Sequence, residues 1–185
     1  MVCFNEGHSN SVDIVDGIKV YRVGVIFHIA RQAISLKYQT VLRRVIEEFR
    51  PDLIQFHWAN PFPAAILLPL IPKETKLLIY WHMDILKEHK LYPLVRPLER
   101  RLLQRANMIT VTSPQYKEGS APLQPFSDKV RIVPNGIDDT KLMPISQREQ
   151  QAICDMYQGK KNVLFVGRHI PYKGLSYLIE AEKHI

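Results

Sequence analysis

Short apolar runs alternate along the chain with longer stretches in which apolar residues recur every three or four positions. Residues 18–25 alternate in polarity and predict a strand. Apolar residues at helical spacing predict a helix over residues 35–49, which Pro51 ends. Further apolar runs rich in β-branched and aromatic residues predict strands at 52–58, 76–82, 107–113, 130–136 and 162–167.

Three more helices are predicted between and after these strands. One covers residues 97–106, with Pro97 in its first turn, where proline is tolerated. A second covers residues 145–157, where Ser146 and Glu149 have the spacing of a capping box. The last one covers residues 174–185. Strands that alternate with helices are typical of an α/β fold, so we expect a Rossmann-like parallel sheet with helices on both faces.

The strands that contain Leu53, Leu77 and Met108 are almost continuously apolar, which favours burial on both faces of the sheet. Ligands of such sheets bind at the carboxyl ends of the strands. The informative residues are therefore those that follow a strand, namely His57, His82, Ser113, residues 135–138 and residues 168–173. Asn135 and Gly136 are expected to shape a turn, because Asn-Gly favours positive φ.

The composition becomes polar and charged between Asp138 and Lys161, which indicates a domain boundary. We therefore expect a Rossmann-like domain over residues 1–140, incomplete at its start, and a linker with a helix over 141–161. Residues 162–185 would begin a second domain. A lone strand and helix cannot bury their apolar faces, so this last part requires some other cover.

The formal net charge of +7 suggests an anionic partner. The basic residues form small groups at helical spacing, typical of solvated helix faces, and no helix-turn-helix, zinc or RNA-recognition signature is present, so a nucleic-acid partner is not expected. Cys3 and Cys154 lie far apart and are expected to be reduced thiols of a cytoplasmic protein. No signal peptide follows Met1, and the longest apolar run, residues 62–71, falls short of the roughly 20 residues that a spanning helix needs.

Two cations flank the turn between the last predicted strand and the last predicted helix, in the sequence Gly167-Arg168-His169-Ile170-Pro171-Tyr172-Lys173-Gly174. Arginine offers a bidentate fork to phosphate, and lysine a mobile point charge. Each charge-assisted contact contributes roughly 1.5–3 kcal/mol. The chain has no Asp-x-Asp pair to hold a divalent metal, so these cations could stabilise a departing diphosphate in its place. The alternative is a solvated loop.

The segments VRIVPNGID and LFVGRHIPYKGLSYLIEA, in this order and spacing, resemble the domain junction of retaining nucleotide-sugar glycosyltransferases with the two-domain GT-B fold. The family includes sucrose synthases and bacterial mannosyltransferases, and the chain looks like a member of glycosyltransferase family 4. The stretch WHMDILKEHKLYPLVRPLERRLLQRANMITVTSPQY is similar to its bacterial O-antigen and capsule mannosyltransferase branch.

The resemblance implies roles for individual residues. Arg168 and Lys173 would bind the donor diphosphate, and Gly167 would let the backbone approach the donor. His82 would lie near the donor sugar and the acceptor hydroxyl as the catalytic candidate; the alternative is a structural histidine. His57 takes the second position of a frequent His-x-His motif whose first position is Gln55 here, and Asp84 either orients His82 or caps the following segment.

The resemblance also implies a reaction, the transfer of a hexose from a nucleotide diphosphate, GDP-mannose or a UDP-sugar, to a saccharide or lipid-diphosphate-linked hydroxyl with retention. No metal or other cofactor is expected. Family members have a first strand, a glycine-rich loop and a Glu-x(7)-Glu pair that this sequence lacks. We therefore expect the chain alone to be inactive, as a fragment or a trimmed member.

Two alternatives concern partners. A half-enzyme with an uncovered apolar face could act as an interaction or assembly module and form homo-oligomers. The basic stretch from Lys87 to Arg105 carries Leu91, Leu94, Leu98 and Leu102 at helical spacing. That pattern is typical of a packed amphipathic helix, and it also suits peripheral contact with an anionic membrane.

Overall fold

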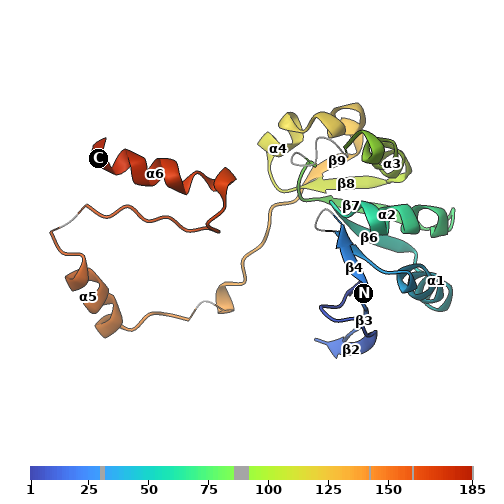
Figure 1. Cartoon of the computed structure of the whole chain (residues 1–185), viewed down its shortest axis with the longest axis horizontal. Helices are drawn as coiled ribbons and strands as arrows, with labels where there is room; N and C mark the ends of the chain where they lie inside the picture. Colours follow the sequence, from blue (N-terminus) through green and yellow to red (C-terminus); the bar gives the residue numbers. More distant parts are fainter. Residues whose placement is uncertain (30–31, 86–91, 142, 160, 185) are drawn as a thin grey trace. The chain divides into compact units, whose positions relative to one another are not determined.

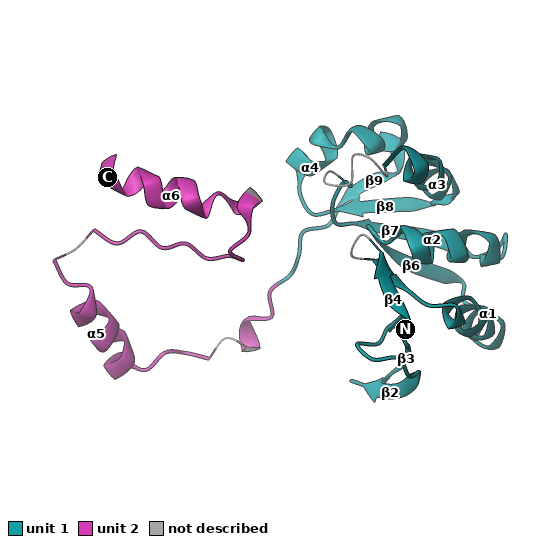
Figure 2. Ribbon diagram, viewed as in Figure 1, with its two compact units in different colours: residues 1–136 teal, residues 137–185 magenta. Residues whose placement is uncertain are grey.

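The computed structural model describes residues 1–29, 32–85, 92–141, 143–159 and 161–184 (Figure 1). The chain divides into two compact units, Met1–Gly136 and Ile137–Ile185 (Figure 2). Each unit is described by itself.

A four-stranded parallel sheet forms the centre of the first unit. Its strands β6 (Leu53–Trp58), β7 (Lys76–Trp81), β8 (Met108–Val111) and β9 (Val130–Ile132) lie side by side in chain order. Helices connect successive strands, as Figure 1 shows. This arrangement confirms the Rossmann-like α/β fold. The connecting elements are α2 (Pro61–Leu67) with the 3-10 turn η1 (Leu68–Leu70), α3 (Tyr92–Arg105), and α4 (Pro114–Gly119) with η2 (Ala121–Lys129).

Burial alternates along β6, and this alternation determines which face of the sheet can carry a site. Phe56 and Trp58 are buried, whereas Leu53, Gln55 and His57 are exposed. The expected burial on both faces therefore holds for β8, where residues 109–111 are all buried, but not for β6. On the buried face the rings of Trp58 and Trp81 stack 5.4 Å apart, at the centre of the hydrophobic core.

Short strands precede the central sheet, and among them the strand predicted at residues 18–25 is confirmed as β3, whereas the others were not predicted. β1 (Val2–Phe4) pairs in parallel with β3 (Ile18–Val23), and β2 (Ser11–Val15) pairs with β3 as an antiparallel hairpin. Asp16 and Gly17 both have positive φ, as the tight turn of that hairpin requires. A second hairpin joins β4 (Phe27–Ile29) and β5 (Gln32–Ile34).

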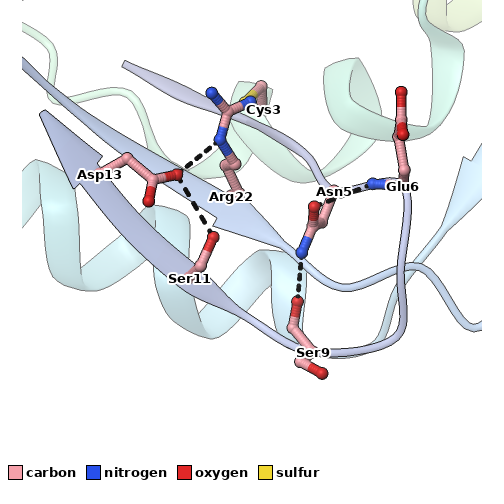
Figure 3. Close-up of polar contacts among 7 residues, drawn as sticks. All are labelled: Cys3, Asn5, Glu6, Ser9, Ser11, Asp13 and Arg22. Atoms are coloured by element: carbon pink, nitrogen blue, oxygen red, sulfur yellow. Dashed lines mark hydrogen bonds and ion pairs between the residues drawn. The ribbon is translucent and has the colours of Figure 1, made fainter. Parts of the chain in front are cut away.

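Side chains reinforce the N-terminal sheet (Figure 3). Arg22 Nε donates to Asp13 Oδ2 at 2.7 Å across the β2–β3 hairpin, and Ser11 Oγ donates to the same oxygen at 3.4 Å. The loop after β1 is closed by Asn5, whose Nδ2 donates to the Ser9 carbonyl and whose Oδ1 accepts from the Glu6 amide. These contacts fix the local register between the two strands and the loop.

The helix predicted before Pro51 is present as α1 (Lys37–Phe49), which buries Tyr38, Leu42 and Ile46. Arg50 follows in the left-handed conformation and ends the helix. α3 begins at Tyr92, five residues earlier than predicted, so Pro97 lies inside the helix and not in its first turn. No helix among the described residues is long and apolar enough to cross a bilayer.

The second unit contains η3 (Asp139–Lys141), α5 (Gln147–Met156), η4 (Pro171–Lys173), α6 (Leu175–Ala181) and η5 (Glu182–His184). The capping box is present: Ser146 Oγ accepts from the Glu149 amide, and the Glu149 carboxylate accepts from the Ser146 amide. The strand predicted at 162–167 is absent, because these described residues pair with no neighbouring strand and Leu164 and Val166 are each 85% exposed.

Candidate active site

Three aromatic rings gather on the exposed face of the central sheet, near the carboxyl ends of β6 and β7. His57 lies on β6, its register partner Tyr80 lies on β7, and His82 follows β7 directly. The His57 ring stacks on Tyr80 at 5.4 Å and on His82 at 5.0 Å, and Tyr80 and His82 are 4.5 Å apart. The structure thus brings together two of the histidines that the sequence singled out.

A hydrogen-bonded chain runs through this cluster. Gln55 Nε2 lies 3.0 Å from His57 Nε2, and His57 Nδ1 lies 2.8 Å from His82 Nε2. The Asn60 side chain also donates to the His57 carbonyl at 3.1 Å and thereby supports the backbone at the end of β6. Burial lowers the pKa of His82, and the neighbouring imidazole of His57 lowers it further. His82 is therefore held mainly neutral near pH 7.

Asn135 reaches the same cluster from the segment after β9. Its Oδ1 accepts a 2.6 Å hydrogen bond from the Tyr80 hydroxyl. The expected positive-φ turn at Asn135 and Gly136 is wrong, because neither residue has positive φ. Asn135 instead ties this segment to β7.

Asp84 lies two residues beyond His82, but in the described structure its hydrogen bonds are with residues other than His82. Its Oδ1 accepts from Trp81 Nε1 at 2.8 Å, from Ser120 Oγ at 2.7 Å and from the Tyr116 hydroxyl at 3.4 Å. The Asp84 amide donates to the Tyr116 hydroxyl at 2.6 Å. Among the described residues His82 Nε2 is bonded to His57, and Asp84 anchors the turn after β7 to α4 and to Ser120, which precedes η2.

Gly167, Arg168 and Lys173 belong to the second unit. Arg168 is exposed in the loop before η4, and Lys173 is the last residue of that turn. The Ile170 amide donates to the Arg168 carbonyl, and the Lys173 amide to the Ile170 carbonyl, so the loop is compact. Gly174 follows with φ of 70°, a conformation that favours glycine, and α6 begins after it. A Cβ at Gly167 would meet the Phe165 ring at 3.2 Å.

The sequence did not single out Tyr80, and it treated Gln55 only as a departure from a motif. A signal for Gln55 was available, because residues two apart on a strand share a face, which places Gln55 beside His57. The position of Tyr80 beside His57 depends on the register of β6 against β7, which the sequence pattern did not predict. No cluster of three or more His, Cys, Asp or Glu that could hold a metal is found among the residues that the structure describes.

The cluster has defined chemical abilities. Two imidazoles joined by a hydrogen bond can donate to or accept from a ligand oxygen, and the exposed face leaves His82 accessible. The cluster lies at the carboxyl ends of parallel strands, where α/β sheets bind ligands. In the second unit, two cations of one short loop suit an anion.

Comparison with known proteins identifies the family of the chain. Residues 2–141 match the sequence model of Glycosyltransferase Family 4. The chain is 30% identical over 159 residues to the O-antigen chain mannosyltransferase C of Escherichia coli, an alignment that covers 84% of the chain and 41% of that protein. It is also 30% identical over 164 residues to the D-rhamnosyltransferase WbpZ of Pseudomonas aeruginosa, with 85% and 42% covered.

The chain thus spans about two fifths of the length of the curated relatives that it matches. The resemblance inferred from the sequence motifs is confirmed. Since the family match covers well over half of its residues, the chain belongs to glycosyltransferase family 4.

Proposed function

We propose that this chain is part of a retaining glycosyltransferase. The enzyme transfers a hexose from a nucleotide diphosphate donor to a hydroxyl of a saccharide or a lipid-diphosphate-linked acceptor. The reaction would take place in the cytoplasm during synthesis of a bacterial surface polysaccharide. The observation that supports this most is the hydrogen-bonded His57–His82 pair at the carboxyl ends of β6 and β7 in a chain of this family. The names of both relatives describe sugar transferases, one of them for mannose.

In this proposal His82 contacts the reacting groups. It is accessible at the end of β7, its pKa is lowered, and His57 holds one of its ring nitrogens. The other ring nitrogen is available to a sugar or acceptor hydroxyl. His57 and Asp84 are positioning residues, the first through the imidazole pair and the second through the turn after β7.

Arg168 and Lys173 bind the donor diphosphate in this proposal, and Gly167 admits the donor close to the backbone. A departing nucleoside diphosphate gains negative charge, which preorganised cations stabilise more in the transition state than in the ground state. A guanidinium and an ammonium separated by four residues can contact both phosphates. We propose GDP-mannose as the donor, in keeping with the mannosyltransferase name of one relative, with UDP-hexoses as the alternative.

The experiment measures donor cleavage and product configuration. Because the chain spans two fifths of its relatives, we expect turnover from a protein of the relatives' length and none from residues 1–185 alone. In that longer protein Arg168→Ala should lower turnover about 100-fold. The matched exposed substitution Lys183→Ala should leave it unchanged. Unchanged turnover of Arg168→Ala, or a product of inverted configuration by NMR, would remove the proposal.

A lipid-linked acceptor would bring the protein to a membrane. The exposed side of α3 could contact that membrane. Leu94 is 77% exposed on α3, and Arg96, Arg100 and Arg101 of the same helix are also exposed, while Leu102 is buried. Leu91 lies outside the described residues. We propose that this face contacts anionic lipid, so the chain should pellet with anionic vesicles at low salt and be released by salt. Equal recovery with neutral vesicles would exclude the contact.

A second candidate, from another functional class, is a catalytically inactive assembly module. It is favoured by the exposed apolar residues of the second unit, which include Leu164, Val166 and Ile179. Such a surface promotes association with another copy. Sedimentation velocity decides: concentration-dependent oligomers that Leu164→Asp abolishes would support this candidate, and a monomer at every concentration would contradict it.

A further inference from the structure

The Gln55–His57–His82 chain constrains where protons can be. It has two nitrogen–nitrogen contacts, of 3.0 Å and 2.8 Å, and each is a hydrogen bond only if exactly one of its two atoms carries the shared proton. Because the three groups are linked in series, the choice at the first contact determines the choice at the second. The orientation of the Gln55 amide therefore bears on His82, although the two residues share no contact in the described structure.

The amide nitrogen of Gln55 faces His57, and an amide nitrogen can only donate. His57 Nε2 must then be the acceptor, which places the proton of the neutral ring on Nδ1. His57 Nδ1 in turn donates to His82 Nε2, and the proton of neutral His82 is left on its Nδ1. We propose that Gln55 is a positioning residue that sets both imidazoles in the Nδ1–H tautomer, so that His82 presents an N–H donor to the ligand.

Adding a proton to this chain requires the amide to turn. A cationic pair carries three ring protons, and both contacts remain hydrogen bonds only when His57 Nε2 donates to the Gln55 oxygen. The titratable groups that face the pair are the two imidazoles themselves and Tyr80, which lies against both rings. The Asp84 carboxylate is bonded to Trp81 and Ser120. The donating amide thus favours the neutral pair, in keeping with the lowered pKa of His82.

The inference rests on the proposed function only in what His82 does: as an N–H donor, it would polarise a sugar or acceptor oxygen and would not remove a proton. The tautomer itself is independent of sugar transfer. The test therefore observes the protons on the ring nitrogens directly. A negative result in the donor-cleavage assay would not contradict the proposed tautomer.

The experiment is a long-range ¹H–¹⁵N correlation spectrum of the histidine side chains at pH 8, recorded on the 185-residue chain. We expect His57 and His82 both to show the Nδ1–H pattern, with the Nδ1–H form at least about fivefold in excess. His8 is an internal standard for this pattern, because its Nδ1 lies 2.6 Å from the Val25 carbonyl, which can only accept.

Two substitutions at the exposed position 55 test the cause. Gln55→Leu removes the donor and should shift both rings toward Nε2–H. Gln55→Glu offers only acceptors, so it should convert both rings to Nε2–H and make the pair take up a proton at higher pH. His8 should keep its pattern in each variant, which also reports an intact fold. Nε2–H on His82 in the unmodified chain, or the same pattern in the unmodified chain and Gln55→Leu, would overturn the inference.

Discussion

The hydroxyl of Tyr80 lies 2.6 Å from Oδ1 of Asn135, and this hydrogen bond joins the end of β7 to the segment after β9. Tyr80 also stacks on the His57 ring and lies tilted against the His82 ring. One side chain therefore links the imidazole pair to the last residues of the first unit.

Tyr80→Phe should lower the free energy of unfolding of the first unit by about 1 kcal/mol, the usual net contribution of one hydrogen bond. The ring contacts with the histidines remain, so the loss reports the hydroxyl alone. Urea unfolding followed by tryptophan fluorescence measures it, since Trp58 and Trp81 both lie in this unit. Tyr177→Phe is the matched control, because Tyr177 is 74% exposed and lies in the second unit. Equal effects of the two substitutions would refute the role of this bond.

The Asp84 carboxylate should contribute more than the Tyr80 hydroxyl. Asp84→Ala would leave Trp81 Nε1 and Ser120 Oγ, both on buried residues, without their acceptor. We expect a loss of about 1–3 kcal/mol in the free energy of unfolding. Asp84→Asn retains an acceptor at the same place and should lose less. If urea unfolding ranks the two variants in the reverse order, the hydrogen bonds to Oδ1 do not hold this turn.

Glu99 gives a prediction for pH. This residue of α3 is only 3% exposed, its Oε1 accepts from the Tyr92 hydroxyl at 2.9 Å, and its Oε2 has no partner among the described residues. Burial raises the pKa of the Glu99 carboxyl, and the Asp84 carboxylate raises it further, against the opposing effects of Tyr92 and Arg96. The folded state therefore holds a proton that the unfolded state releases.

This difference in bound protons determines how the free energy of unfolding changes with pH. The contribution of Glu99 to the free energy of unfolding is complete below its ordinary pKa of about 4.3 and is lost as pH rises through the raised value. Glu99→Gln should lack this loss, so its stability relative to the unmodified chain should increase from pH 4 to pH 7. Urea unfolding across this range measures the difference, with the exposed Glu47→Gln as control. A constant difference across the range would show that Glu99 titrates normally.

The polarity pattern predicted best the elements whose signals are local. α1 carries its apolar face in thirteen consecutive residues, and the box of Ser146 and Glu149 begins α5 within four. The run at 162–167 has equal β character, but a strand requires a neighbouring strand, and these residues pair with no strand in the described structure. The predicted start of α3 was five residues too late. Proline is more common in the first turn of a helix than in its interior, so the prediction began the helix at Pro97.

The candidate site was likewise predictable only where the signal is local in the sequence. His57 and His82 stand out because a residue at the carboxyl end of a strand in an α/β sheet lies at the edge where ligands bind. The participation of Tyr80 depends on the register of β6 against β7, which no single strand encodes. Asp84 is hydrogen-bonded to Trp81 at the end of β7, to Tyr116 of α4 and to Ser120 just before η2, so its proximity in sequence to His82 was misleading.

The most direct test of the central claim is a pyrophosphate titration of the 185-residue chain, followed by NMR at the Arg168 guanidinium and the Lys173 ammonium. Both signals should shift together and saturate at millimolar pyrophosphate, and Arg168→Ala should abolish the shift at Lys173 while Lys183→Ala leaves it unchanged. Signals of Arg168 and Lys173 that stay in place, or that move no more than those of Lys183, would contradict the assignment of the donor diphosphate to these two side chains.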